Sequence, residues 1–158
     1  MSKRFTVLLA TVVAFAAIAA GCGSSSDDST EVVVLTKTEF IEQGDAICVK
    51  GSKQIEKEAD EFAEDNDVDT ANPKTEDQEE VITTVVGPAL QTQAEELDAL
   101  GAPEGEEEAV AAIVEALEDG AAELEEDPGA LLGENVSNPL EEAEKLASEF
   151  GFKECGQE

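Results

Sequence analysis

The sequence predicts an all-α fold, an antiparallel four-helix bundle, and three observations point to this class. Apolar residues recur at spacings of three and four in four separate segments of residues 36–156, which is the pattern of helices with one buried face. Helix-capping residues, glycines and prolines stand at the ends of these segments. The connections are short, and short connections place successive helices antiparallel to one another.

The first predicted helix begins after Thr36, which forms a capping box with Glu39. Leu35 and Phe40 occupy the two positions of a hydrophobic staple. The buried face of this helix comprises Phe40, Gly44, Ile47, Cys48, Gly51, Ile55, Ala59 and Phe62. Because glycine lowers helix propensity, the two glycines on this face predict the close approach of a neighbouring helix.

The second predicted helix covers residues 75–100 and ends before Gly101, a suitable C′ residue. Thr75 and Gln78 form a second capping box at its start. The dipeptide Gly87-Pro88 lies inside this helix, and because proline lacks a backbone donor we expect a kink there. The buried face comprises Val81, Ile82, Val85, Val86, Ala89, Leu90, Leu97 and Leu100.

Two further helices complete the predicted bundle. The third has Pro103 in its first turn and ends at the turn Asp127-Pro128-Gly129. The fourth is capped by Asn138, with Pro139 at its first position. It ends at Gly151-Phe152 in the manner of a Schellman motif, which folds Phe152 back onto the helix. The inward-facing residues of these two helices are Val110, Ile113, Val114, Leu117, Ala121, Leu124, Leu140, Ala143, Leu146, Ala147 and Phe150.

Residues 1–21 have the layout of a secretory signal peptide, with a basic start and no charge from Phe5 to Ala20. The run Ala19-Ala20-Gly21-Cys22 resembles the lipobox of bacterial lipoproteins. That resemblance implies that Cys22 carries diacylglycerol and becomes the new N-terminus. The alternative is an ordinary cleaved signal peptide that happens to be followed by a cysteine.

Residues 22–35 are expected to be the lipidated cysteine and a flexible tether, because Gly23 to Thr30 offer no apolar side chain to bury. The helical domain, residues 36–156, follows. Acyl chains such as palmitate would hold the chain firmly, since each buried methylene contributes about 0.8 kcal/mol. The sequence therefore predicts a lipid-anchored protein on the extracytoplasmic face of the cell membrane.

The chain has three cysteines, and lipid attachment would consume the thiol of Cys22. Only one pairing then remains, between Cys48 on the buried face of the first helix and Cys155 after the last helix. Such a disulfide would join the C-terminal tail to the bundle, and it would persist outside the cytoplasm. The alternative is that both residues are unpaired buried thiols.

Two segments carry a resemblance to a known family. Residues 39–48 read Glu-Phe-Ile-Glu-Gln-Gly-Asp-Ala-Ile-Cys, and residues 151–156 read Gly-Phe-Lys-Glu-Cys-Gly. With the lipobox, they resemble small, largely uncharacterised actinobacterial lipoproteins that share a helix Phe-Ile-x-x-Ala/Gly-Asp-x-Ile-Cys and a terminal aromatic-Gly-x-x-x-Cys. The resemblance implies a disulfide-stapled helical domain, and it brings no activity with it.

The composition excludes several classes of function. The chain has 39 acidic against 9 basic residues, a net charge of −30, so it lacks the basic footprint that nucleic acids require. It has no histidine, which excludes Ser-His and Cys-His pairs and histidine-bearing zinc sites. We expect no enzyme. An acid-pair hydrolase stays an alternative, and it would need a cleft with two buried, unpaired carboxylates.

One acidic segment has the spacing of a calcium loop. Asp65, Asp67, Asp69 and Glu76 match positions 1, 3, 5 and 12 of an EF-hand, which supply oxygen ligands to calcium. Thr70 stands where that loop needs glycine for its sharp turn. A calcium-binding module is therefore the alternative function, and a solvated acidic loop is the simpler interpretation.

These observations together predict a membrane-anchored, non-catalytic binding module of the cell envelope. Its partner is expected to be another envelope protein, bound at a helix face that the sequence does not identify. No cofactor is expected apart from the calcium of the alternative interpretation.

Overall fold

The computed structural model describes residues 34–132 and 138–155, and every regular element among these residues is helical. The predicted all-α class is therefore confirmed. The segment Val32–Glu158 is one compact unit. Its elements are α1 (Lys37–Asp65), α2 (Thr75–Val81), the π-helix η1 (Ile82–Val86), α3 (Gly87–Ala99), α4 (Glu107–Glu126), the 3₁₀-helix η2 (Pro128–Leu131) and α5 (Glu141–Phe150).

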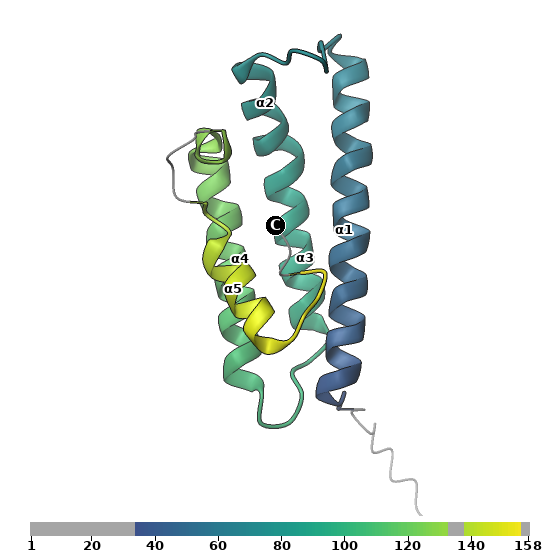
Figure 1. Cartoon of the computed structure of the whole chain (residues 1–158), viewed down its shortest axis with the longest axis vertical. Helices are drawn as coiled ribbons and strands as arrows, with labels where there is room; N and C mark the ends of the chain where they lie inside the picture. Colours follow the sequence, from purple (N-terminus) through teal and green to yellow (C-terminus); the bar gives the residue numbers. More distant parts are fainter. Residues whose placement is uncertain (1–33, 133–137, 156–158) are drawn as a thin grey trace, which may run out of the picture. The chain divides into compact units, whose positions relative to one another are not determined.

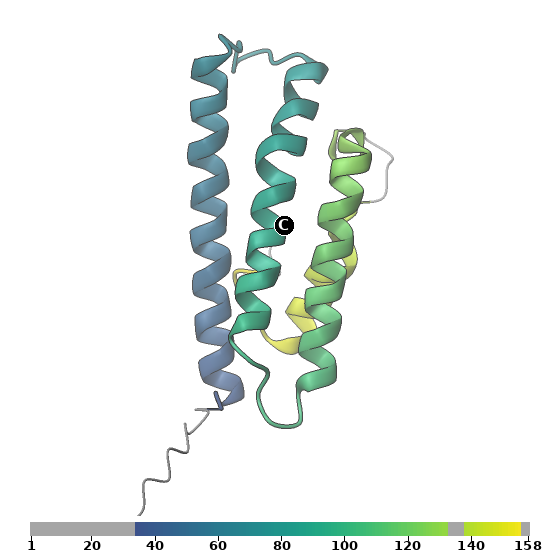
Figure 2. The ribbon, with the colours of Figure 1, turned by 180° about the vertical axis from the view of Figure 1, so that it is seen from behind.

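The helices form an antiparallel bundle with α3 at its centre (Figures 1 and 2). Elements α2, η1 and α3 follow one another without a break and serve as the second long helix. Helix α3 packs against both α1 and α4, and α5 packs against α4. Because α5 has 10 residues and α1 has 29, the fourth helix covers only part of the bundle's length.

Two helix ends that local sequence signals define, the start of α1 and the end of α5, have the expected geometry. The Thr36 hydroxyl oxygen accepts a hydrogen bond from the Glu39 N–H, and the Glu39 carboxylate accepts one from the Thr36 N–H at 2.9 Å. Hydrogen bonds from the side chain and backbone of Thr36 hold the pKa of Glu39 below its usual value. At the end of α5, Gly151 has a φ of 117° and the Phe152 N–H donates to the Ala147 carbonyl, which confirms the Schellman motif.

The second helix differs from its prediction in two ways. Thr75 is the first helical residue and no side chain caps this end, so the predicted capping box is wrong. Instead, the Gln78 amide donates to the carbonyls of Pro73 and Lys74. The disturbance expected at Gly87-Pro88 takes the form of the π-helix η1, whose wider turn accommodates a proline that would otherwise crowd the carbonyl four residues earlier.

The last two helices begin later than predicted. Pro103 does not open α4, because its carbonyl accepts from the Glu106 N–H in a turn where Gly105 has a φ of 85°. A positive φ at the third residue of a turn favours glycine or asparagine. The predicted cap at Asn138 is wrong, because Leu140 is the N-cap of α5 and no side chain caps this end. The Asn138 side-chain oxygen instead accepts a hydrogen bond from the Leu140 N–H in the turn before the helix.

Three phenylalanines form the centre of the core where α1, α5 and the tail meet. The Phe40 ring is 1% exposed, and its centroid lies 5.8 Å from that of Phe150 and 5.9 Å from that of Phe152. Gly44 makes this packing possible, because a Cβ there would overlap the Phe152 ring. Gly51 faces the Gln93 side chain of α3 in the same way. The close approach predicted at both glycines is confirmed, although at Gly44 part of the neighbour is the tail.

Replacing Gly44 with alanine should lower the free energy of unfolding by about 1–3 kcal/mol, the usual cost of overpacking a core. The added methyl group meets a buried aromatic ring that cannot move away, and this cost outweighs the gain in helix propensity of about 1 kcal/mol. Denaturant unfolding followed by circular dichroism measures the change.

Gly51→Ala is the matched control, because it gives the same gain in propensity on the same helix. Its methyl group meets the end of the flexible Gln93 side chain, which can move. We expect a smaller change than for Gly44→Ala. Equal destabilisation by the two substitutions would contradict this account of the packing.

Candidate functional site

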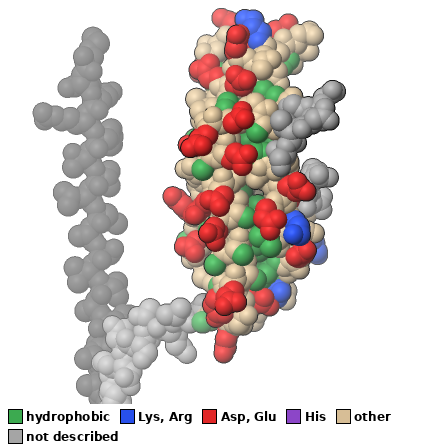
Figure 3. Space-filling model, turned by 90° about the vertical axis from the view of Figure 1, so that its left-hand side faces the viewer, with side chains coloured by type: hydrophobic (Ala, Val, Ile, Leu, Met, Phe, Trp, Pro, Cys, Tyr) green, Lys and Arg blue, Asp and Glu red, His purple; other side chains and the backbone are tan. Residues whose placement is uncertain are grey.

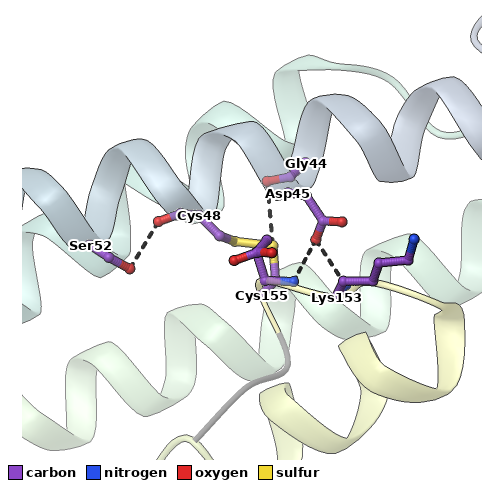
Figure 4. The surroundings of a disulfide bond; sticks show 7 residues. Gly44, Asp45, Cys48, Ser52, Lys153 and Cys155 are labelled. Atoms are coloured by element: carbon purple, nitrogen blue, oxygen red, sulfur yellow. Dashed lines mark hydrogen bonds between the residues drawn. A yellow bond between two sulfur atoms is a disulfide. The ribbon is translucent and has the colours of Figure 1, made fainter.

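The tail that follows α5 is bonded to α1 by a disulfide between Cys48 and Cys155, as predicted (Figure 4). The two Cα atoms are 5.2 Å apart, within the range that disulfides allow. Cys48 is buried, whereas Cys155 is half-buried. The Cys155 sulfur also lies 3.4 Å from the Gly44 carbonyl oxygen, so the tail is packed closely along one turn of α1.

Asp45 holds the same tail by hydrogen bonds (Figure 4). Its carboxylate oxygen Oδ1 accepts from the backbone N–H of Lys153 at 3.0 Å and from that of Glu154 at 2.9 Å. The sequence alone predicts no role for Asp45. The available signal was its position three residues before Cys48, which places both side chains on neighbouring parts of one helix face.

A partly enclosed cavity of about 210 Å³ lies beside the disulfide, and we call it the disulfide cavity. Helices α1, α3, α4 and α5 and the tail all contribute to its wall. Most of the wall is apolar, and its residues are Cys48, Ser52, Ile55, Leu90, Gln93, Leu97, Ile113, Leu117, Leu140, Ala143, Glu144, Ala147, Glu154 and Cys155.

Gln93 brings an amide group to the wall of the disulfide cavity. Its side chain is 7% exposed, and it is the one buried polar side chain in the part of the chain that the structure describes. No hydrogen bond joins its amide to another described group, and the amide is still reached by solvent, because no fully enclosed side-chain nitrogen or oxygen among the described residues lacks a partner. Gly51 leaves the space that the amide occupies. A buried amide costs free energy unless it has hydrogen-bond partners, so water or a ligand has to supply them.

The ionisable side chains on this wall are both acidic. Glu144 is half-buried, and its two carboxylate oxygens accept from the Asn138 amide nitrogen at 3.3 and 3.4 Å. Glu154 is exposed. None of the described lysines contributes to the wall. The cavity therefore combines an apolar interior, one amide and a negative charge.

A second pocket, of about 250 Å³, lies where the loop between α1 and α2 meets η2, and we call it the distal pocket. Its wall comprises Phe62, Ala63, Val68, Pro73, Asp77, Gln78, Val81, Ile82 and Leu132. Leu131 and Leu132 beside it are 40% and 36% exposed. The distal pocket therefore lies next to exposed leucines. Figure 3 shows one face of the unit, on which acidic side chains are numerous.

The four residues with EF-hand spacing do not form a metal site in the structure. Asp65 ends α1, Asp67 lies in the following turn with a φ of 52°, and Glu76 lies in the first turn of α2. The Asp69 carboxylate accepts a hydrogen bond from the Ala71 N–H. Among the described residues, no group of three or more acidic, cysteine or histidine side chains is placed to hold a metal ion.

The predicted signal peptide, the lipidation site Cys22 and most of the tether lie outside the described residues. Of the helices in residues 34–132 and 138–155, none is long and apolar enough to cross a bilayer.

Comparison of the chain with models of protein families, with curated proteins and with solved structures finds no match.

Reduction of the disulfide should lower the free energy of unfolding by about 2–5 kcal/mol. The bond closes a loop with a sequence separation of 107, for which the chain-entropy model gives about 4.7 kcal/mol. Denaturant unfolding with and without reductant measures the difference. The double variant Cys48→Ala, Cys155→Ala should be insensitive to reductant, and a wild-type chain that is equally insensitive would show that the bond contributes nothing.

Calcium titrated into residues 23–158 should give weak heat that does not saturate and that salt suppresses, because the acidic side chains of the loop are not gathered around one point. Calorimetry with wild type and with Glu76→Ala should give the same result. A saturable site that disappears in Glu76→Ala would establish the EF-hand interpretation instead.

Proposed function

We propose that the chain is a lipoprotein anchored through Cys22 to the extracytoplasmic face of the cell membrane, and that its helical unit is a non-catalytic binding module for another envelope protein. The anchoring part rests on the sequence of residues 1–22, with its signal-like leader and lipobox. The resemblance to actinobacterial lipoproteins supports the same interpretation.

The position of the distal pocket supports the binding role. The tether joins the helical unit at Val34, next to the start of α1, whereas Phe62 lies near the end of α1. At about 1.5 Å per residue, these two ends of α1 are roughly 40 Å apart. The pocket and the exposed leucines beside it therefore lie at the end of the unit away from the tether, where an anchored protein can present them to a partner.

The disulfide cavity offers little for catalysis. An acid-pair hydrolase needs two buried carboxylates. The cavity has two acidic residues on its wall, of which Glu144 is only half-buried and Glu154 is exposed. The Ser52 hydroxyl donates to the Cys48 carbonyl, and the chain has no histidine to activate it as a nucleophile. These features favour binding over reaction chemistry.

The partner is tested by placing a photo-crosslinking amino acid at Leu132 of the membrane-anchored chain in cells. We expect an adduct of one defined mass, because Leu132 is exposed and lies on the wall of the distal pocket. The matched control is Val34, an exposed apolar residue at the opposite end of α1. Identical adducts from both positions, or none from Leu132, would argue against the distal pocket as the binding surface.

The anchor is tested separately by Cys22→Ala, followed by membrane fractionation and labelling with a fatty acid. We expect this variant to lose both the label and its membrane association, since the acyl chains supply most of the affinity for the bilayer. A variant that keeps both would show that the lipobox interpretation is wrong.

A further inference from the structure

The disulfide cavity is large enough for a small organic molecule. An engineered apolar cavity of about 150 Å³ takes up benzene, so about 210 Å³ accommodates one aromatic ring with a short substituent. A peptide helix is far too large for this space, because its diameter with side chains is about 10–12 Å. The cavity therefore selects small ligands by size.

The Gln93 amide gives the apolar cavity a polar group that a ligand can bond to. A leucine at this position would fill the same space without the cost of burying an amide. The chain instead places Gln93 against Gly51, where a Cβ would overlap the amide group in its present position. Ligand pockets typically combine an apolar wall with a few such polar groups, which fix the orientation of the ligand.

The charge of the wall indicates which polar group the ligand carries. Glu144 and Glu154 bring negative charge to the cavity. Lys50 and Lys53 share a neighbouring hollow with Glu154, but they do not line the cavity itself. The net charge of −30 gives the surrounding surface the same sign. Such a field raises the local concentration of cations and repels anions. Carboxylate ligands such as fatty acids are therefore disfavoured, whereas a protonated amine is favoured.

We propose that the disulfide cavity binds a small apolar amine in its protonated form. Its apolar body would lie among Ile55, Leu90, Ile113 and Leu117, and the carboxylates of Glu144 and Glu154 would balance the charge of its ammonium group. The Gln93 amide supplies a further hydrogen bond. This site goes beyond the proposed protein-binding role, since the disulfide cavity and the distal pocket share no wall residue.

The test uses residues 23–158, which contain the whole compact unit with its core and its disulfide. Phenethylamine is titrated into this fragment and followed by calorimetry and by two-dimensional NMR. Phenylacetate has the same ring with the opposite charge, and ethylamine has the same charge without the ring. We expect saturable binding of phenethylamine at one site, at least tenfold tighter than either control, with shifts at cavity residues.

Two variants separate the site from general attraction to an acidic surface. Glu144→Gln with Glu154→Gln should weaken phenethylamine binding at least tenfold. Glu141→Gln with Glu149→Gln removes the same charge from exposed positions of α5 that do not line the cavity, and it should leave binding within about twofold. Gln93→Leu should also weaken binding at least tenfold, with its fold checked by circular dichroism.

Several results would overturn the proposal. Phenethylamine that binds no tighter than ethylamine would show simple ion attraction, and equal binding of phenylacetate would show that charge plays no part. Equal losses in the two glutamate pairs would place the amine on the surface. None of these results bears on the cross-linking test of the distal pocket, so the two proposals fail or stand independently.

Discussion

The structure depends on the contact between the C-terminal tail and one face of α1. Helix α1 packs on α3 and η1, and α5 packs on α4, so the first and last helices are joined by the tail and by the contacts of Phe150 with Phe40 and Lys37. Three interactions of different kinds hold this contact: the Phe152 ring against Gly44, the hydrogen bonds from the tail to Asp45, and the disulfide. They occupy successive positions on α1, so they stabilise one arrangement together.

The same contact produces the disulfide cavity. Helix α5 is short and ends at Phe150. Residues 151–154 then cross to α1, where Cys155 is bonded to Cys48. The C-terminal half of the α1 face, including Ile55 and Phe62, is consequently only half-buried. The region that the tail leaves open is the region where Gln93 meets Gly51. The cavity is therefore a direct result of joining a short fourth helix to a long first helix.

What the sequence could predict follows from the range of the interactions. The Thr36 capping box and the Gly151 helix end involve partners within six residues, so local patterns were sufficient. Asp45 bonds to residues 108 and 109 positions away, which no local pattern reveals. The calcium loop shows the reverse case, because correct spacing in the sequence did not bring its carboxylates together. The distal pocket and the disulfide cavity could not be predicted from the sequence either, because they depend on how the packed helices leave parts of their neighbours uncovered.

The acidity of the chain explains why a covalent bond suits this contact. The chain has a net charge of −30, and its acidic side chains repel one another, which opposes a compact state. The ion pairs among the described residues are at the surface, and surface pairs contribute about 0–1 kcal/mol each. A disulfide adds stability without depending on charge or salt. Because the buried core and the disulfide supply stability, the surface can stay acidic, and an acidic surface is what the proposed amine site requires.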